Sequence, residues 1–397
     1  MLEFISLEEA NRIIMKNYKL SEIEVVALQH SRGRVLAENL IAKTNIPPFN
    51  RAAVDGYAVN SNDTGDRQFS IEGEIPAGHV YSRLITSGKG TRIFTGALVP
   101  PEITAVVRQE DVEVLGSNIM LKKPWSLGDN IALCGEDIHE GEQLLNQGTV
   151  ITPACVGLLA CQGFTKIPVF RRPKIGILST GDEIVIPGEP LGPGKIYNSN
   201  LYSIVALVEE LGAEAVPLGR VTDSIEAISA TLDKALEQVD LVITTGGASA
   251  GDYDVIKDAI THIGGNLLFW RVAIKPGTPI IAGNYKNKLI IGLSGNPAAA
   301  LIGAELLVAP LIRKMLGHTN TNLKIVNAVA SGDVHKACGI RRMIRVQVEE
   351  TSTGRIAILA LKQKSGILKS FTECNGVLDL GPNELIKDGE QHKVILF

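Results

Sequence analysis

Between Lys174 and Gly317 the sequence alternates short apolar runs with amphipathic segments. The runs KIGIL, EAVPLG, DLVITT, NLLFWRVAI and KLIIGL are typical of strands. The segments between them place apolar residues at helical spacing, as residues 201–211 do before Gly212. Repeated alternation of strand and helix indicates a parallel sheet with helices on both faces. We therefore predict a doubly wound parallel α/β sheet domain over residues 171–319.

The flanking regions follow different patterns. Residues 45–139 are rich in glycine, proline and short apolar alternations, which predicts a β-rich inserted domain. Residues 320–397 carry short strands separated by turns, which predicts a C-terminal β-barrel domain. Helix-start signals occur at Ser6 and at Thr152–Pro153. Residues 1–44 and 140–170 are therefore expected to form one helical domain from two segments.

Charge and composition exclude several classes of protein. The 39 basic and 43 acidic side chains give a net charge of -4, which argues against a nucleic-acid or membrane-surface binder. The N-terminus lacks a signal-peptide pattern, and the apolar stretch PAAALIGAELLVAPLI is too interrupted to span a bilayer. Five cysteines without a CxxC pair indicate reduced thiols in a cytoplasmic protein. The seven histidines form no HExxH motif, so a zinc enzyme is not expected.

Four polar, glycine-bearing loops follow predicted strands: STGDE, GRVTDS, TTGGASAGDYD and SGNPAAA. Ligands of open α/β sheets bind at the carboxyl ends of the strands. Glycine lets backbone N–H groups approach an anion, and a helix start adds partial positive charge. Since neither a Walker loop nor GxGxxG occurs, we predict a different phosphate-binding site. Its expected members are Thr180, Gly181, Gly246, Gly247, Ser249, Gly251, Gly295, Asn296 and Pro297.

A competing interpretation makes GASAG a nucleophile elbow. Ser249 would be the nucleophile of a hydrolase, with candidates such as Asp333 and His335 completing a triad. Two carboxylates, Asp252 and Asp254, follow the serine directly, and their negative charge would hinder formation of an oxyanion. The phosphate-binding interpretation is therefore favoured.

Carboxylates at the same sheet edge suggest a divalent cation. Mg²⁺ prefers hard oxygen ligands, commonly carboxylates together with substrate phosphates. We expect Glu183, Asp252 and Asp254 to hold Mg²⁺, while Asp223 either joins the site or caps a helix. Lys275 at the end of RVAIK is the candidate counter-charge for a phosphate.

Taken together, the ordered motifs resemble one family. PPFNRAAVDGYAV, IFTGALVPP, GED, STGDE, IYNSN, TTGGASAGDYD, AIKPG and GNP recur in this order in the molybdopterin molybdenumtransferases, the MoeA and gephyrin E-domain group. The resemblance implies a homodimer with four parts per subunit: an elongated helical domain, a β-rich insert, an α/β domain and a C-terminal β-barrel. It implies that the α/β domain of one subunit faces the insert of the other.

The resemblance also implies a reaction and its residues. Adenylylated molybdopterin and molybdate would react with Mg²⁺ assistance to give molybdenum cofactor and AMP, and a molybdopterin adenylyltransferase would be a possible partner. Functional positions of the family fall on Asp55, Thr95, Asp137, Glu183, Asp223, Asp252 or Asp254, and Lys275, with Pro276 and Gly277 beside the lysine and Ser365 or Ser370 from the last domain.

The sequence departs from the family pattern at a few positions. Ala132 and Thr278 stand where an arginine and a lysine are usual, and both changes remove a cation from the expected anion site. Arg271 or Arg51 could compensate. Ser294 and Val54 stand where proline and methionine are usual. Alternatives therefore stay open: a divergent paralogue that handles tungstate, a non-catalytic pterin-binding scaffold, or an enzyme similar to the adenylyltransferases.

Overall fold

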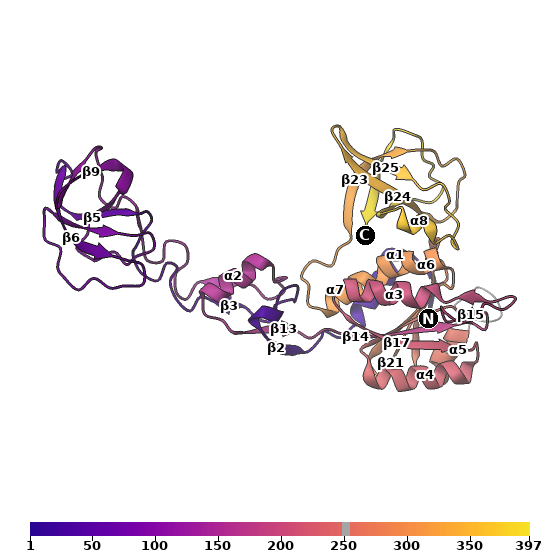
Figure 1. Cartoon of the computed structure of the whole chain (residues 1–397). Coiled ribbons are helices and arrows are strands. Elements are labelled where there is room, and N and C mark those ends of the chain that lie inside the picture. The colour runs from indigo at the N-terminus through magenta and orange to yellow at the C-terminus, as the bar shows by residue number, and fades with distance from the viewer. Residues whose placement is uncertain (248–254) are drawn as a thin grey trace.

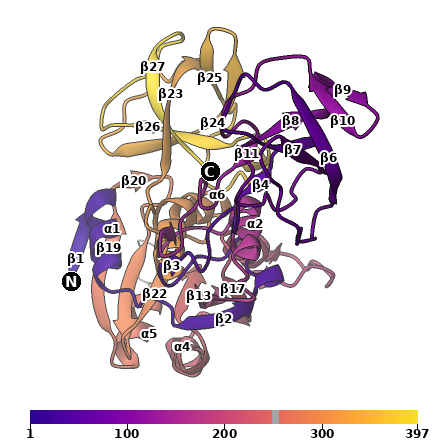
Figure 2. The same ribbon diagram turned by 90° about the vertical axis from the view of Figure 1, so that its left-hand side faces the viewer.

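The computed structural model describes residues 1–247 and 255–397. The molecule is elongated (Figure 1), with a small β domain at one end, a narrow middle unit, and an α/β unit carrying a barrel at the other end. The end-on view in Figure 2 again shows the barrel standing on one side of the α/β sheet. The predicted fold class is confirmed in its main parts.

The α/β unit is built on a seven-stranded sheet in the order β1-β19-β21-β22-β18-β14-β17. All neighbouring strands are parallel except β21, which runs antiparallel to both of its neighbours. The sequence analysis did not predict β21, which is short and follows the Pro-Gly-Thr-Pro segment of residues 276–279. The strands are β1 (Leu2–Ile5), β14 (Lys174–Thr180), β17 (Glu214–Val221), β18 (Leu241–Thr245), β19 (Asn266–Val272), β21 (Ile281–Tyr285) and β22 (Lys288–Leu293).

Helices cover both faces of this sheet, each over its own hydrophobic core. One core contains the apolar stretch of residues 297–312, which is buried in the protein as expected. No helix among the described residues is both long and apolar enough to cross a membrane. The barrel-side helices are α1 (Leu7–Lys16), α3 (Ser199–Glu210), α6 (Pro297–Gly303), the π-helix η3 (Ala304–Val308) and α7 (Ala309–Met315); the opposite face carries α4 (Ile225–Gln238) and α5 (Val255–His262).

The N-terminal segment lies on the α/β unit, which differs from its expected grouping with residues 140–170. Strand β1 pairs in parallel with β19. Ser6 caps α1 by accepting from the Glu9 amide at 3.1 Å, and Leu7, Ala10 and Ile14 are buried against the sheet. The physical reason is that this apolar face completes the α/β core.

The middle unit is therefore made of fewer helical residues than expected. It has two antiparallel strand pairs and one helix, around a small core that includes Leu36, Leu159 and Ile167. Thr152 caps the helix, as predicted. Its elements are β2 (Ile23–Ala27), the 3₁₀ turn η1 (Leu28–His30), β3 (Leu40–Ile41), β12 (Gln143–Leu145), α2 (Pro153–Cys161) and β13 (Lys166–Phe170).

The insert at the far end is a six-stranded sheet in the order β8-β5-β7-β6-β10-β9, with a hydrophobic core on each side. A short pair, β4 with β11, joins it to the middle unit. Its elements are β4 (Arg51–Ala52), β5 (Gly56–Asn60), β6 (Gln68–Ile75), β7 (Lys89–Ile93), β8 (Ala105–Arg108), η2 (Gln109–Asp111), β9 (Val112–Leu115), β10 (Asn118–Leu121) and β11 (Ile131–Ala132).

The C-terminal barrel closes through the pairing of β24 with β26. It docks on the α/β unit because the short strand β20 pairs in parallel with β24. Arg341 adds a second link, since its guanidinium binds both Glu8 of α1 and Asp379 of the barrel. The elements are β20 (Ile274–Lys275), β23 (Lys324–Ser331), β24 (Arg341–Thr351), β25 (Gly354–Leu359), α8 (Lys369–Thr372), β26 (Gly376–Leu380) and β27 (Gln391–Leu396); β15 (Ile184–Val185) and β16 (Ile196–Tyr197) form a separate pair on the α/β unit.

The junction between α7 and the middle unit generates a stability prediction. Gly317 has φ +83°, and a Cβ there would collide with the ring of Phe170. Gly163 has φ +70° with open space around it. We expect Gly163→Ala to lower the free energy of unfolding by about 1–2 kcal/mol through backbone strain alone. Gly317→Ala should cost about 1–3 kcal/mol more because the ring must move. Chemical denaturation measures both free energies of unfolding. An equal decrease for Gly163→Ala and Gly317→Ala would contradict the packing of Gly317 against Phe170.

Candidate active site

The carboxyl ends of β14, β18 and β22 meet in space, as the sequence predicted. The hydroxyls of Ser179 and Thr245 lie 3.1 Å apart at the ends of β14 and β18. Gly246 (φ +91°) passes so close to the carbonyl oxygen of Thr180 that a Cβ would collide with it. Glycine is therefore required here by contact as well as by conformation.

The loop after β22 adjoins the loop after β18. A Cβ on Gly295 would lie 3.4 Å from the Cα of Gly246, and the Asn200 side-chain amide donates to the Gly295 carbonyl at 2.8 Å. The structure thus brings together the predicted loop residues at this edge: Thr180, Gly181, Gly246, Gly247 and Gly295.

Acidic side chains gather beside these loops. Burial raises the pKa of Asp223, and the nearby negative charges of Glu183 and Asp182 raise it further. Asp223 does not cap α4, because Ser224 takes that position and accepts from the Ala227 amide at 3.3 Å. Mutual repulsion among carboxylates is the electrostatic condition that a divalent cation relieves.

Ser249, Gly251, Asp252 and Asp254 lie outside the described residues. Within residues 1–247 and 255–397, no three His, Cys, Asp or Glu side chains are grouped closely enough to hold a metal ion. Asp333 and His335, the triad candidates, lie 3.8 Å apart in the barrel and do not line the cavity described next.

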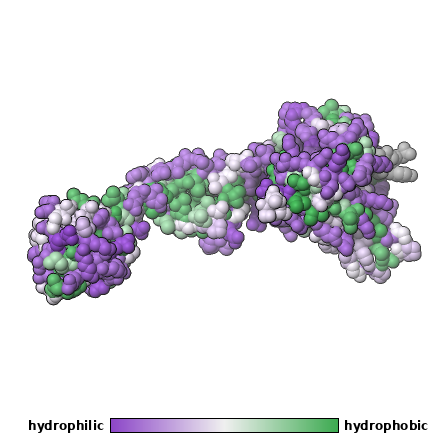
Figure 3. Space-filling view, turned by 90° about the horizontal axis from the view of Figure 1, so that it is seen from above, coloured by the Kyte–Doolittle hydropathy of each residue, from purple (hydrophilic) through white to green (hydrophobic). Residues whose placement is uncertain are grey.

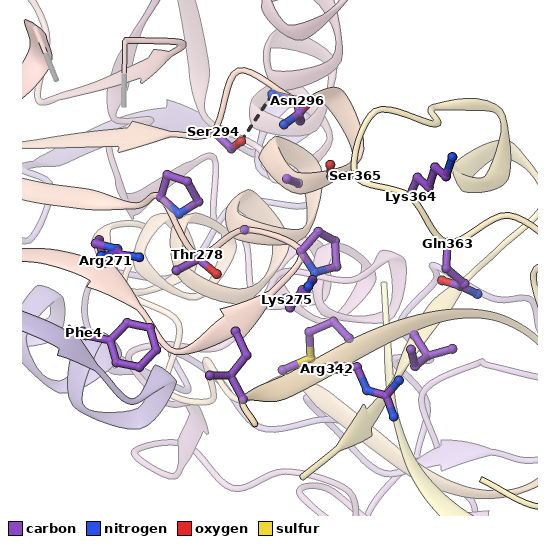
Figure 4. Close-up of a pocket in the computed structure, with 17 residues that line it drawn as sticks. Phe4, Arg271, Lys275, Thr278, Ser294, Asn296, Arg342, Gln363, Lys364 and Ser365 are labelled. Carbon is purple, nitrogen blue, oxygen red and sulfur yellow. Dashed lines mark hydrogen bonds between the residues drawn. The ribbon is translucent and has the colours of Figure 1, made fainter. Parts of the chain in front are cut away.

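A cavity of about 780 Å³ separates the α/β unit from the barrel (Figure 4). Among the predicted residues, Lys275, Pro276, Gly277, Asn296 and Ser365 line it. Thr278, which replaces a usual lysine, also lines it, and its hydroxyl donates to the Ile274 carbonyl at 2.6 Å. The further lining residues are Phe4, Arg271, Pro279, Ser294, Ala299, Ile340, Arg342, Met343, Ile344, Gln363 and Lys364.

Three of these further lining residues carry positive charge. Arg271 comes from the end of β19, Arg342 from β24 and Lys364 from a barrel loop. No acidic residue is found among the described residues that line the cavity. Arg271 was an expected substitute, whereas Arg342, Lys364 and Phe4 were missed. Only the pairing of β20 with β24 reveals that Arg342 lies directly opposite Lys275.

The barrel loop that carries Lys364 and Ser365 is held at both ends. The buried Arg345 guanidinium donates to the carbonyls of Lys362 and Lys364 at 2.9 and 3.1 Å. In α6, whose first residue is the predicted Pro297, the Ala298 amide donates to the Ser365 carbonyl at 3.0 Å. Ser370 lies elsewhere: it is buried, and its hydroxyl donates to the Ile367 carbonyl.

One loop connects the acidic edge to the cationic cavity. A Cβ on Gly295 would reach van der Waals contact with Gly246 at the strand ends, while its neighbours Ser294 and Asn296 line the cavity. The Asn296 amide donates to the Ser294 hydroxyl at 3.3 Å, a contact drawn in Figure 4. Groups that attract a divalent cation and groups that attract an anion therefore lie side by side.

The remaining predicted residues lie on the insert, at the opposite end of the subunit (Figure 1). The amide and hydroxyl of Thr95 both donate to one oxygen of Asp55, at 2.7 and 2.8 Å. These bonds hold the pKa of Asp55 below its usual range. Asp137 is exposed on the segment after β11, where its amide donates to the Ile46 carbonyl at 3.0 Å. Arg51 lies directly opposite Ala132 across the β4–β11 pair. Arg51 can thus present its charge beside the position of the missing arginine.

Comparisons with known proteins cover the whole chain. Three family models match in order: the MoeA N-terminal region (domain I and II) at residues 5–163, a probable molybdopterin binding domain at 176–314, and the MoeA C-terminal region (domain IV) at 327–397. A molybdopterin molybdenumtransferase of Bacillus subtilis is 34% identical over 99% of this chain and 94% of its own length. One from Staphylococcus epidermidis is 34% identical over 99% and 95%.

Solved structures agree with these relatives. A molybdopterin biosynthesis MoeA protein from Pyrococcus horikoshii superimposes with a TM-score of 0.87 at 32% identity, covering 99% of both chains. A molybdenum cofactor biosynthesis protein from Pyrococcus furiosus, 23% identical with a TM-score of 0.63, shares the fold. The chain therefore belongs to the MoeA family of molybdenum cofactor biosynthesis, the molybdopterin molybdenumtransferases.

Proposed function

We propose that this protein inserts molybdenum from molybdate into adenylylated molybdopterin and releases AMP. The observation that carries the proposal is the loop of residues 294–296, which joins an acidic sheet edge to a cavity lined by cations. A substrate with a phosphoanhydride needs both kinds of group, because negative charge develops on its oxygens as the bond to the leaving phosphate breaks.

Different residues would bind the anion and the metal ion. Lys275 and Arg342 bind phosphate or molybdate oxygens, since both are cations that line the cavity from paired strands. Glu183, with Asp252 or Asp254, would hold Mg²⁺, which supplies charge neutralisation at the phosphates. Burial is the main cause of the raised pKa of Asp223, but the charges of Glu183 and Asp182 also contribute, and this nearby negative charge supports the allocation. The amides of the glycine loops would bind the remaining oxygens.

A homodimer would complete the site. The insert lies at the opposite end of the subunit from the barrel (Figure 1), so Asp55, Thr95 and Asp137 would serve the cavity of a partner subunit. Helix α2 supports such a partner: its sequence PACVGLLAC is apolar all round, yet only Leu159 is buried. Apolar helices of this kind are normally covered. Figure 3 shows hydrophobic surface on the middle unit.

Within that dimer, Asp55 would orient a group of the substrate as an ionised carboxylate, in keeping with its lowered pKa. Thr95 would hold this carboxylate in place through its amide and hydroxyl. A cytoplasmic location belongs to the proposal and is supported by the five unpaired cysteines. A molybdopterin adenylyltransferase remains the proposed partner that supplies the substrate. The match of residues 5–163 to the MoeA N-terminal region disfavours the alternative that this chain is itself such an adenylyltransferase.

Release of AMP from adenylylated molybdopterin on addition of molybdate tests the activity. We expect Glu183→Gln to lower the Mg²⁺-dependent rate by about 10²–10³-fold because it removes charge stabilisation in the transition state. The variant should keep its circular dichroism spectrum. Glu189→Gln, on an exposed segment nearby, is the matched control and should leave the rate unchanged. Parallel runs with tungstate identify the preferred metal, and no release by the folded wild type would favour a scaffold role.

Complementation tests the shared site. Asp55→Asn and Lys275→Gln should each abolish AMP release, because both sites of each homodimer lose one group. Mixed subunits should recover about a quarter of wild-type activity, since half of the dimers are mixed and each of these keeps one intact site. Absence of recovery, with mixed dimers shown by mass spectrometry, would mean that the two residues serve the same subunit or different functions.

The raised pKa of Asp223 predicts a pH-dependent stability. Because the folded pKa lies above the unfolded value, the ionised carboxylate costs stability at pH values above the unfolded pKa, and this cost disappears below it. Asp223→Asn should therefore raise the melting temperature at pH 7, and the gain should vanish as the pH falls through the folded pKa toward the unfolded value. Thermal unfolding across this range measures the effect. An increase in melting temperature of Asp223→Asn that becomes larger as the pH falls would contradict the raised pKa of Asp223.

A further inference from the structure

One end of the cavity presents an aromatic ring to solvent. Phe4 lines the cavity and is 45% exposed, although phenylalanine is usually buried. Single exposed apolar side chains are common, so exposure alone carries no conclusion. The backbone beneath the ring supplies a second observation.

Phe4 and Arg271 both adopt left-handed backbone conformations, with φ of 54° and 69°. They occupy opposed positions in the β1–β19 pair, because Glu3 pairs with Trp270 and Ile5 with Val272. This conformation is unfavourable for residues with large side chains, and such strain concentrates at functional sites. Phe4 and Arg271 both line the cavity, and both have strained backbones. This strain suggests that the positions of their side chains serve ligand binding.

The two side chains form a layered arrangement. The guanidinium of Arg271 lies 5.6 Å from the ring centroid of Phe4 and 5.6 Å from that of Trp270. Its Nε is buried without a hydrogen-bond partner among the described residues. Figure 4 shows Phe4 and Arg271 together at one side of the cavity, with Lys275 and Arg342 farther along. A guanidinium held between aromatic rings gives the surface a planar, cationic character.

The other end of the cavity is suited to a phosphate. Lys275 and Arg342 are register partners of the parallel β20–β24 pair, so their side chains project from the same face. The Arg342 Nη2 donates to the Glu384 carbonyl at 2.9 Å, while its buried Nε has no hydrogen-bond partner among the described residues. Ser365 and Asn296 add neutral polar groups along the wall.

We propose that this cavity binds a planar heteroaromatic ring and its phosphate as one unit, with the ring stacked on Phe4 and Arg271 and the phosphate held by Lys275 and Arg342. The inference rests on the proposed function, whose substrate carries two such units: adenine with its phosphate and the pterin with its phosphate. Phe4 is therefore a residue that determines recognition of the ring, and Arg342 is a further anion-binding residue.

Titration calorimetry with three probes tests the proposal: AMP, 6-hydroxymethylpterin monophosphate, and ribose 5-phosphate, which has no ring. Phe4→Leu should weaken binding of a ring-bearing probe by about 5- to 100-fold, as expected for loss of an aromatic stacking partner, and leave ribose 5-phosphate within about twofold. Phe4→Trp should restore the lost affinity. Arg342→Gln should weaken ribose 5-phosphate and the ring-bearing probe by similar factors, because it removes a charge-assisted contact to phosphate.

Tyr202→Leu is the matched control, since this ring is 50% exposed on α3 and does not line the cavity. The ring-bearing probe whose affinity falls identifies the unit that occupies the cavity. An equal effect of Phe4→Leu on all three probes, or no effect on either ring-bearing probe, would overturn the proposal. These are binding measurements, so ring-selective binding without AMP release would refute the proposed reaction while leaving this inference intact.

Discussion

The short parallel pairing of β20 with β24 is the contact on which the site depends. It is only two residues long, yet it docks the barrel on the α/β unit and sets Lys275 beside Arg342. Two neighbouring cations repel each other, so the arrangement is favourable when an anion lies between them. The salt bridges of Arg341 to Glu8 and Asp379 stabilise the same junction from the side of α1. The same strand pairing therefore docks the barrel and brings these two cations together.

Opposite charges are kept apart at the neighbouring edges of this site. Carboxylates gather after β14 and β17, cations gather around the cavity, and the glycine-bearing loop at residues 294–296 lies between them. If the carboxylates and the cations were intermixed, they would form salt bridges with each other, and no unpaired charge would remain to bind a ligand. A substrate phosphoanhydride with a bound divalent cation has the complementary distribution of charge, which is why the geometry suits the chemistry of this family.

Sequence patterns predicted the features that are determined by neighbouring residues in the chain. The strand–helix alternation located the α/β sheet, and the glycines after β14, β18 and β22 were recognised because glycine lets backbone N–H groups approach an anion. At Gly246 the structure adds a steric reason, because a Cβ there would collide with the Thr180 carbonyl. Contacts between distant segments could not be predicted in this way. Residues 2–5 join the sheet by pairing with residues some 270 positions away. Arg342 lies in a strand whose sequence shows nothing unusual, and the role proposed for Phe4 depends on its position opposite Arg271.

Anomalous diffraction from crystals soaked with tungstate and AMP tests most directly the claim that the cationic cavity and the acidic strand ends form one site. The account predicts that tungsten density and the AMP phosphate lie together in the cavity lined by Lys275 and Arg342, with the insert of a partner subunit facing both. Tungsten bound elsewhere, with the cavity free of both ligands, would contradict it.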